Sequence, residues 1–239
     1  MINLILIRHG QSEWNAKNQF TGWVDASLSD VGRNEAKLAG KLIKNLNIDI
    51  SYYYTSYLKR ASDTLSIILD IIDSKNMNFT QAWELNERHY GSLTGLNKEE
   101  TKTKLGSDLF NTYRRSWDTA PPALDEKSKF TKLFSKLNIG IAKENIPLTE
   151  SLKDTYNRVI PYYKTKILSQ IILGKKILIS AHGNSLRALC KDIFNIADDK
   201  INFLEIPTGN PLCIIFGNDY TNVKDAFYLD EKRKKKIML

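Results

Sequence analysis

Short apolar runs alternate along the chain with segments in which apolar residues recur at helical spacing. The first run, residues 3–8, is almost wholly apolar and predicts a buried strand. Comparable runs predict strands at residues 50–54, 79–86, 175–181, 214–219 and 226–230. Helical spacing marks residues 29–46, 57–72, 149–173 and 185–194. This alternation is typical of an α/β fold, and we expect a three-layer sandwich with a mostly parallel sheet flanked by helices.

For the helix at residues 29–46 we predict both the N-cap and the side that is buried. Ser29 is the expected N-cap, because a serine hydroxyl accepts a hydrogen bond from the free backbone amides of a first turn. Leu38, Leu42 and Leu46 fall on one side of this helix, with Ala39 and Ile43 beside them, and predict the side that faces the core.

The helix predicted at residues 57–72 directly follows a strand. Ser56 is its expected N-cap, and Arg60 lies in its first turn. Since this turn starts where the strand ends, we expect Arg60 near the carboxyl edge of the sheet.

Residues 93–147 differ from the rest of the chain in composition. They are rich in Lys, Asn, Ser and Thr, and their periodicity is weak. We interpret them as a largely helical, lid-like insertion in a single domain that spans residues 1–230. A basic C-terminal tail follows at residues 231–239.

Two of the three histidines follow apolar runs and precede a glycine. His9 ends the run LILIRHG, and His182 ends the run KILISAHG. If the two strands are neighbours, the imidazoles converge at the edge of the sheet where ligands bind in α/β folds. Two histidines at matching strand ends therefore indicate a functional site.

Metal binding and serine catalysis are the weaker interpretations of these histidines. The chain has no HxH, HExxH or CxxC spacing, and no acidic residue closely flanks either HG pair, so we expect no metal. It also has no GxSxG turn for a serine nucleophile.

A histidine nucleophile for phosphoryl groups fits the surrounding residues better. A neutral imidazole can attack phosphorus, and nearby cations stabilise the charge that develops. Arg8 adjoins His9, Arg60 is expected at the same edge, and Gly10 would let the backbone approach an anion closely. The leaving alkoxide needs a separate acid, for which Glu87 in the cluster NERHYG is a candidate.

Motifs along nearly the whole chain, from residue 3 to about 215, add a resemblance to a known family. They include RHGQSEWN, FTGW, LSDVGRNEA, TSYLKRA, LNERHYGSLTGLNK, YRRSW, PLTESL, RVIPYY and AHGNSLRAL. In these motifs the sequence resembles the cofactor-dependent phosphoglycerate mutases of the histidine phosphatase superfamily. Residues 123–146 depart from the family, whose loop here is richer in proline and aspartate.

The resemblance implies a role for each matching position. The catalytic residues would be His9 as phosphorylated nucleophile, Glu87 as proton donor and acceptor, and His182, Arg8 and Arg60 as stabilisers of the phosphoryl group. The residues completing the phosphate pocket would be Ser12, Asn15, Gly183 and Asn184. Those holding the rest of phosphoglycerate would be Thr21, Gly22, Arg88, Tyr90, Lys98, Arg114 and Arg115.

The family also implies a substrate, a primer and an assembly. The implied reaction interconverts 3-phosphoglycerate and 2-phosphoglycerate in glycolysis and gluconeogenesis, primed by 2,3-bisphosphoglycerate and without a metal. Dimers or tetramers are common, and a C-terminal segment can cover the active site. The alternatives on the same fold are a histidine phosphatase and a bisphosphoglycerate mutase or phosphatase.

Charge and composition bear on partners and location. The net charge is +8, and five of the cations lie in the tail at residues 232–236, which we expect to be a solvated terminus. A nucleic-acid binder is a further alternative, but the chain lacks a recognition motif. No apolar run approaches the ~20 residues that span a bilayer, and no signal peptide is evident, so we expect a cytoplasmic protein. Cys190 and Cys213 form no close-spaced motif, which also favours a reducing compartment.

Overall fold

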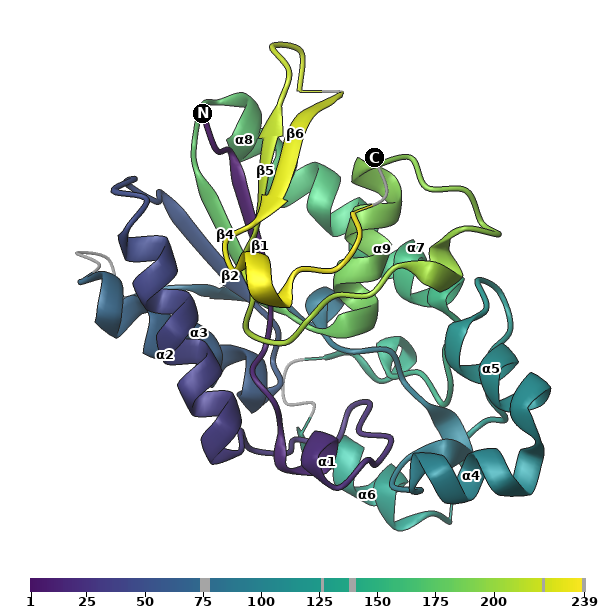
Figure 1. The fold of residues 1–239 in the computed structure, drawn as a ribbon. Helices are drawn as coiled ribbons and strands as arrows, with labels where there is room; N and C mark the ends of the chain where they lie inside the picture. Colours follow the sequence, from purple (N-terminus) through teal and green to yellow (C-terminus); the bar gives the residue numbers. More distant parts are fainter. Residues whose placement is uncertain (74–77, 126, 138–140, 221, 238–239) are drawn as a thin grey trace.

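The computed structural model describes residues 1–73, 78–125, 127–137, 141–220 and 222–237, and shows a six-stranded sheet with helices on both faces (Figure 1). The strands are β1 (Leu4–Arg8), β2 (Tyr52–Thr55), β3 (Thr80–Gln81), β4 (Ile177–Ala181), β5 (Leu212–Phe216) and β6 (Val223–Tyr228). Their order is β3-β2-β4-β1-β5-β6. The first four strands pair in parallel, whereas β5 is antiparallel to both β1 and β6. The predicted mostly parallel sheet is therefore confirmed.

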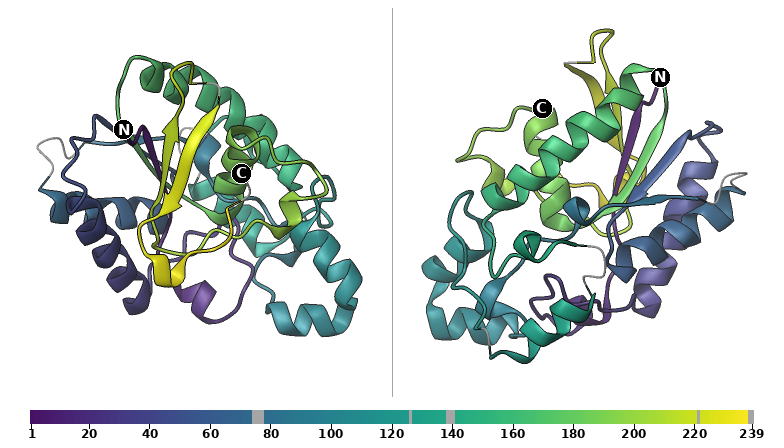
Figure 2. Two further views of the ribbon diagram at one scale, coloured as in Figure 1. Left: turned by 45° about the horizontal axis from the view of Figure 1, so that its top comes forward. Right: turned by 180° about the vertical axis from the view of Figure 1, so that it is seen from behind.

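Alternation along each strand divides the core into two layers. Ile5 and Ile7 of β1 belong to a buried cluster with α2 (Asp30–Lys44) and α3 (Lys59–Ile72). Leu4 and Leu6 point the other way, into a cluster with α7 (Leu152–Tyr162) and α9 (Gly183–Ile193). Figure 2 shows these helix pairs on opposite sides of the sheet. The three-layer sandwich is confirmed.

The buried side of α2 differs in part from the prediction. Leu38 is 41% exposed, while Ala36, Ala39, Gly40 and Ile43 are buried. A Cβ on Gly40 would lie only 3.0 Å from Ile71 of α3, so the helices approach closely through small side chains. The prediction is therefore confirmed for Ala39 and Ile43, while Leu42 and Leu46 are only half-buried, because close helix packing centres the buried side on small residues. The Ser29 cap is confirmed, since its side chain accepts from the Gly32 amide.

Ser56 is not the N-cap of α3, which begins after Leu58 without a side-chain cap. The Ser56 hydroxyl instead accepts from the Leu58 amide at 3.1 Å and lies 2.7 Å from Nε2 of His182. The chain turns two residues later than predicted because Ser56 is engaged with the neighbouring strand end. Arg60 is still in the first turn of α3.

Other boundaries shift by a few residues. The strand predicted at residues 79–86 is reduced to β3 and followed by a 3₁₀ helix at Trp83–Leu85. Helix α9 begins at Gly183, two residues earlier than predicted. The helix predicted at residues 149–173 is divided into α7, a π-helical stretch at Tyr163–Leu168 and α8 (Ser169–Ile172).

The predicted insertion is helical and lies at the carboxyl edge of the sheet. It contains α4 (Lys98–Leu105), α5 (Ser107–Arg115) and α6 (Lys129–Leu137). Together with α1 (Glu13–Ala16), these helices lie below the sheet in Figure 1, facing the ends of β1 and β4. Over the part of the chain that the structure describes, no helix combines the length and apolarity that crossing a membrane requires.

Candidate active site

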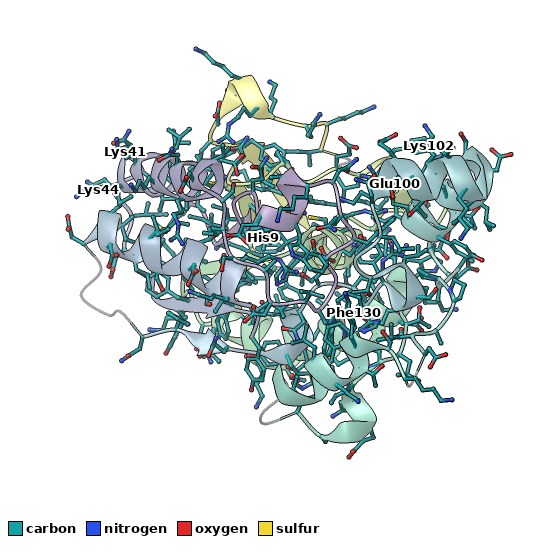
Figure 3. The ribbon with its side chains drawn as sticks, turned by 90° about the horizontal axis from the view of Figure 1, so that it is seen from below. His9, Lys41, Lys44, Glu100, Lys102 and Phe130 are labelled. Carbon is teal, nitrogen blue, oxygen red and sulfur yellow. The ribbon has the colours of Figure 1, made fainter. Side chains whose placement is uncertain are left out.

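His9 and His182 meet beyond the carboxyl ends of two neighbouring strands. β1 pairs with β4 in parallel, with Arg8 opposite Ala181, so the residue after each strand reaches the same edge. The two imidazole centroids lie 4.9 Å apart in an edge-to-face arrangement. Viewed from this edge, His9 lies near the middle of the molecule, between α2 on one side and α4 on the other (Figure 3). The predicted convergence is confirmed.

Hydrogen bonds fix the tautomer of His9. Its Nδ1 lies 2.6 Å from the carbonyl oxygen of Gly10, which can only accept, so Nδ1 carries the proton. Its Nε2 lies 3.2 Å from the Nε of Arg60, which can only donate, so Nε2 keeps its lone pair. Burial lowers the pKa of His9 well below the usual value, and Arg60 and Arg8 lower it further. The imidazole is therefore neutral and can act as a nucleophile through Nε2.

Gly10 serves a different purpose from the one predicted. A Cβ at Gly10 would lie 2.1 Å from the carbonyl oxygen of Gly32, at the start of α2. The Gly10 amide donates to the hydroxyl of Thr64, 3.1 Å away on α3. The glycine is needed because α2 packs directly on the His9 loop, and Gly10 lines neither of the cavities described below.

His182 is fully buried behind His9. Its Nε2 is paired with Ser56, and its Nδ1 has no hydrogen-bond partner among the described residues. Burial lowers the pKa of His182, and Arg60 and His9 add to the shift, so this imidazole is also neutral. His182 contacts the site through the ring of His9 and lines neither cavity.

Two adjoining cavities open beside His9. The His9 cavity, of about 80 Å³, is lined by Arg8, His9, Asn15, Gln19, Thr21, Gly22, Arg60, Glu87, Tyr90, Lys98 and Arg114. The Arg115 cavity, of about 240 Å³, is lined by Arg8, Glu87, Tyr90, Arg114, Arg115, Gly183, Asn184, Arg187, Leu204, Glu205, Ile206, Pro207 and Lys235. The shared residues Arg8, Glu87, Tyr90 and Arg114 join the two cavities into one site.

Cations dominate the lining of both cavities. Arg60 is 1% exposed, its guanidinium donates to the carbonyls of Gly22 and Val24 at 2.8 Å, and burial lowers its pKa to about 10. Burial also lowers the pKa of Lys98, which lies above the ring of Phe20. Buried cations in a weakly screened pocket attract anions strongly. The lining therefore suits a small molecule with several negative charges.

Glu87 faces both cavities with an asymmetric carboxylate. Its Oε1 accepts from the Arg88 amide at 2.8 Å, and from the amide and the side chain of Asn184 at 3.1 and 2.9 Å. No described residue donates to its Oε2. An ideal Cβ on Gly183 would lie 3.7 Å from Oε2, so this glycine keeps space open beside it. Glu87 thus has one oxygen held by the protein and one available.

A buried ion pair holds the loop that carries Glu87. Arg158 of α7 pairs with Glu150 at 2.6 Å, and these side chains are 9% and 4% exposed. The same guanidinium donates to the carbonyls of Glu84, Asn86 and Glu87 at 2.6–3.0 Å. Satisfying several carbonyls at once fixes the backbone of this loop, and with it the position of the carboxylate.

Three predicted site residues line neither cavity. Ser12 is the N-cap of α1 and orients Asn15 through reciprocal hydrogen bonds. Arg88 is fully buried and donates to the carbonyls of Tyr113 and Arg114 at 3.1 Å, which holds the end of α5. His182 is the third of these residues, and all three support residues that face the cavities. All the other predicted site residues line at least one cavity.

Several lining residues were not predicted from the sequence. They are Gln19, Arg187, Leu204, Glu205, Ile206, Pro207 and Lys235. Arg187 follows Asn184 by one helical turn in the motif AHGNSLRAL, so its spacing could have indicated it. Gln19 directly precedes the motif FTGW, and Lys235 belongs to the basic tail. The residues at 204–207 come from a segment with no local signal and are brought in by the fold.

The tail is only in part the solvated terminus that we expected: Lys232, Lys234, Lys235 and Lys236 are exposed, whereas Arg233 is half-buried. Arg233 pairs with Asp230 at 2.6 Å and donates to the carbonyls of Thr208 and Gly209. Lys235 lines the Arg115 cavity and lies 3.5 Å from Glu205, which also pairs with Arg115 at 2.9 Å. These contacts fold the tail back over the site, because the acceptors it meets come from loops distant in the sequence.

Metal-ligating groups do not gather in the described residues: no three His, Cys, Asp or Glu side chains there are placed to hold an ion. The chemistry of the site is that of an anion pocket with a neutral imidazole and one available carboxylate oxygen.

Comparisons with known proteins agree with this chemistry. The model of the histidine phosphatase superfamily (branch 1) matches residues 4–132. A 2,3-bisphosphoglycerate-dependent phosphoglycerate mutase of Pelagibacter ubique (strain HTCC1062) is 50% identical over 239 residues, which are 100% of each chain. A phosphoglycerate mutase of Candida albicans is 44% identical over 96% of this chain and 93% of its own.

Solved structures share the fold at lower identity. A mycobacterial glucosyl-3-phosphoglycerate phosphatase superposes with a TM-score of 0.72 at 18% identity, covering 95% of this chain and 97% of that one. The chain therefore belongs to the histidine phosphatase superfamily and, within it, to the 2,3-bisphosphoglycerate-dependent phosphoglycerate mutases.

Proposed function

We propose that this protein interconverts 3-phosphoglycerate and 2-phosphoglycerate through a phosphoryl group carried on His9. One observation carries the proposal beyond the family resemblance: His9 is held neutral, with the lone pair of Nε2 beside the buried guanidinium of Arg60. That geometry suits attack on phosphorus, with a cation beside the oxygens that gain charge.

The residues divide the reaction between them. Glu87 accepts the proton of the free substrate hydroxyl as the phosphoryl group leaves His9, so the N–P bond breaks and a new O–P bond forms. His9 then takes the phosphoryl group from the other substrate oxygen, to which Glu87 returns the proton. The available Oε2 of Glu87 is the oxygen suited to both transfers.

The remaining cations suit the rest of the substrate. Arg114 and Arg115 end α5 and face the Arg115 cavity, where planar guanidinium groups match a carboxylate or a second phosphate. Lys98 and Asn15 complete the lining around His9. The Thr21 hydroxyl is buried in the lining of the same cavity and has no hydrogen-bond partner among the described residues.

The primer 2,3-bisphosphoglycerate fits the same residues. The Nε of Arg8 and the hydroxyl of Thr21 are buried, have no hydrogen-bond partner in the part of the chain that the structure describes, and would be donors for a multiply charged anion. Arg8, Arg60, Lys98, Arg114 and Arg115 would hold it. When bound, it would supply the phosphoryl group that first loads His9.

A mutase assay with purified protein tests the proposal. We expect conversion of 3-phosphoglycerate to 2-phosphoglycerate that rises with added 2,3-bisphosphoglycerate and does not change with a chelator. Release of inorganic phosphate without 2-phosphoglycerate would instead support a phosphatase on this fold. Activity lost on chelation would contradict a metal-free reaction.

Three further expectations belong with this proposal. Residues 1–230 would form a single domain with a helical insertion at about 93–147 and a basic tail. The protein would act in the cytoplasm, on small phosphoglycerates rather than nucleic acids. A homodimer or homotetramer is expected in solution, which light scattering would check.

A further inference from the structure

The side chain of Asn184 bridges an arginine and the carboxylate of Glu87. Its Oδ1 accepts from Nη1 of Arg187 at 2.9 Å. Its Nδ2 donates to Oε1 of Glu87 at 2.9 Å and to the hydroxyl of Tyr90 at 3.1 Å. A guanidinium can only donate and a carboxylate can only accept. Only one of the two orientations of the Asn184 amide satisfies both neighbours.

The orientation of this amide decides how the Glu87 carboxylate is used. With Nδ2 toward Glu87, Oε1 receives three donors, and Oε2 is left with none among the described residues. With the amide reversed, its oxygen would face the carboxylate and repel it, and its Nδ2 would face the Arg187 guanidinium. The Glu87 carboxylate would then lose the hydrogen bond from Asn184 that helps to hold Oε1 in its present position.

Arg187 is held so that this hydrogen bond is maintained. It is 5% exposed, and its Nη2 donates to the carbonyl of Ile201 at 2.8 Å. No described residue forms an ion pair with it, and burial lowers its pKa to about 9. Burying a cation without a carboxylate partner lowers the stability of the fold. We therefore expect Arg187 to serve the site rather than stability.

We propose that Arg187 is a positioning residue that sets the Asn184 amide, and thereby leaves Oε2 of Glu87 as the oxygen that transfers the proton. The inference rests on the proposed function, because it takes Glu87 as the acid and base of the reaction. Arg187 acts through Asn184 and does not itself transfer a proton.

The test compares Arg187→Met, Asn184→Ala and the double variant in the mutase assay. Arg187→Met should lower kcat about 10- to 100-fold, because a misplaced acid–base group slows the chemical step. KM for 3-phosphoglycerate should change less than about 3-fold, since the loss is in the transition state. In the Asn184→Ala background, Arg187→Met should change kcat less than about 2-fold, because the two residues act as one unit.

Lys191 offers a matched control on the same helix. It lies one turn after Arg187, its side chain is 12% exposed, and it also donates to a backbone carbonyl of the following loop, that of Ile196. Lys191→Met should lose comparable stability but keep kcat within about 2-fold. If Arg187→Met does not fold, Arg187→Lys keeps the charge, but its shorter side chain with one nitrogen cannot reach both Asn184 and the Ile201 carbonyl as the guanidinium does. Its kcat should therefore fall, and the loss should disappear in the Asn184→Ala background.

The outcomes separate this inference from the proposed function. A wild-type protein without mutase activity overturns the proposed function, and the inference with it. An active wild type with unchanged kcat in Arg187→Met overturns the inference alone. So does a raised KM with unchanged kcat, which would make Arg187 a direct substrate ligand. The inference is also overturned if Lys191→Met lowers kcat as much as Arg187→Met does. It is likewise overturned if Arg187→Met lowers kcat equally in the wild-type and the Asn184→Ala backgrounds.

Discussion

The Nε of Arg60 lies 3.2 Å from Nε2 of His9, although 51 positions separate the two residues in the sequence. The contact joins the end of β1 to the first turn of α3. It leaves Nε2 of His9 unprotonated, with a buried cation beside the place that a phosphoryl group would occupy in the proposed reaction. Burial lowers the pKa of His9, and this contact lowers it further, because a proton on Nε2 would face the guanidinium.

His9→Ala should abolish labelling of the protein by 2,3-bisphosphoglycerate and lower mutase activity at least about 1,000-fold, because no other imidazole of the described residues lines either cavity. Acid-labile phosphate measured on the intact protein checks the expectation. His89→Asn, a histidine outside both cavities, is the control and should still be labelled. Labelling retained in His9→Ala would assign the phosphoryl group to another residue.

Glu87→Gln should still form phosphoenzyme but turn over about 100- to 10,000-fold more slowly, because the amide cannot accept the substrate proton. Quenched-flow measurement of phosphoenzyme formation and steady-state kcat separate the two steps. Wild-type turnover in this variant would remove the acid–base role of Glu87.

Arg115→Ala should raise KM for 3-phosphoglycerate about 10-fold, with a smaller effect on phosphoenzyme formation. The reason is that a charge-assisted hydrogen bond to the substrate, worth about 1.5–3 kcal/mol, would be lost away from His9. Arg33→Ala removes an exposed arginine from α2 and serves as the control. An unchanged KM in Arg115→Ala would show that Glu205, its present partner, is its main contact.

Arg158→Met should lower the free energy of unfolding by about 3–5 kcal/mol, because it leaves the buried Glu150 without its partner. Urea unfolding measures the change. The control is Lys44→Met, which breaks the exposed pair with Asp73 and should cost less than about 1 kcal/mol. Equal losses in the two variants would mean that the Arg158 network is no more than a surface contact.

His89 should make stability fall as the pH is lowered. Burial chiefly, and Arg158 in addition, lower its pKa from 6.5 to about 4. Between these values the unfolded chain binds a proton that the folded protein does not, so the free energy of unfolding decreases as pH falls from 6.5 to 4. This histidine alone accounts for about 3 kcal/mol of that decrease, at 1.36 kcal/mol per unit.

His89→Asn provides the measurement, because the asparagine oxygen can still accept from the Gly91 amide, as Nδ1 does at 3.0 Å. Urea unfolding from pH 4 to 7 should give a flatter pH dependence in the variant than in the wild type. Identical slopes would mean that His89 is protonated in the folded protein.

The sequence by itself determined the fold class and most of the residues that line the candidate site. Apolar runs and helical spacing are local properties, so they located β1, β4 and α7. His9 and His182 could be placed at one edge because parallel strands end together. Cation-rich motifs around them identified an anion site, and the family resemblance supplied the substrate.

Only the tertiary structure decided how those residues are used. Gly10 accommodates the carbonyl of Gly32, and Arg88 supports the end of α5, because neighbours from distant segments occupy the space around them. Arg187 and Lys235 reach the Arg115 cavity through the packing of α9 and the return of the tail. Long-range packing sets these contacts, and spacing along one chain cannot encode which side chain another segment will meet.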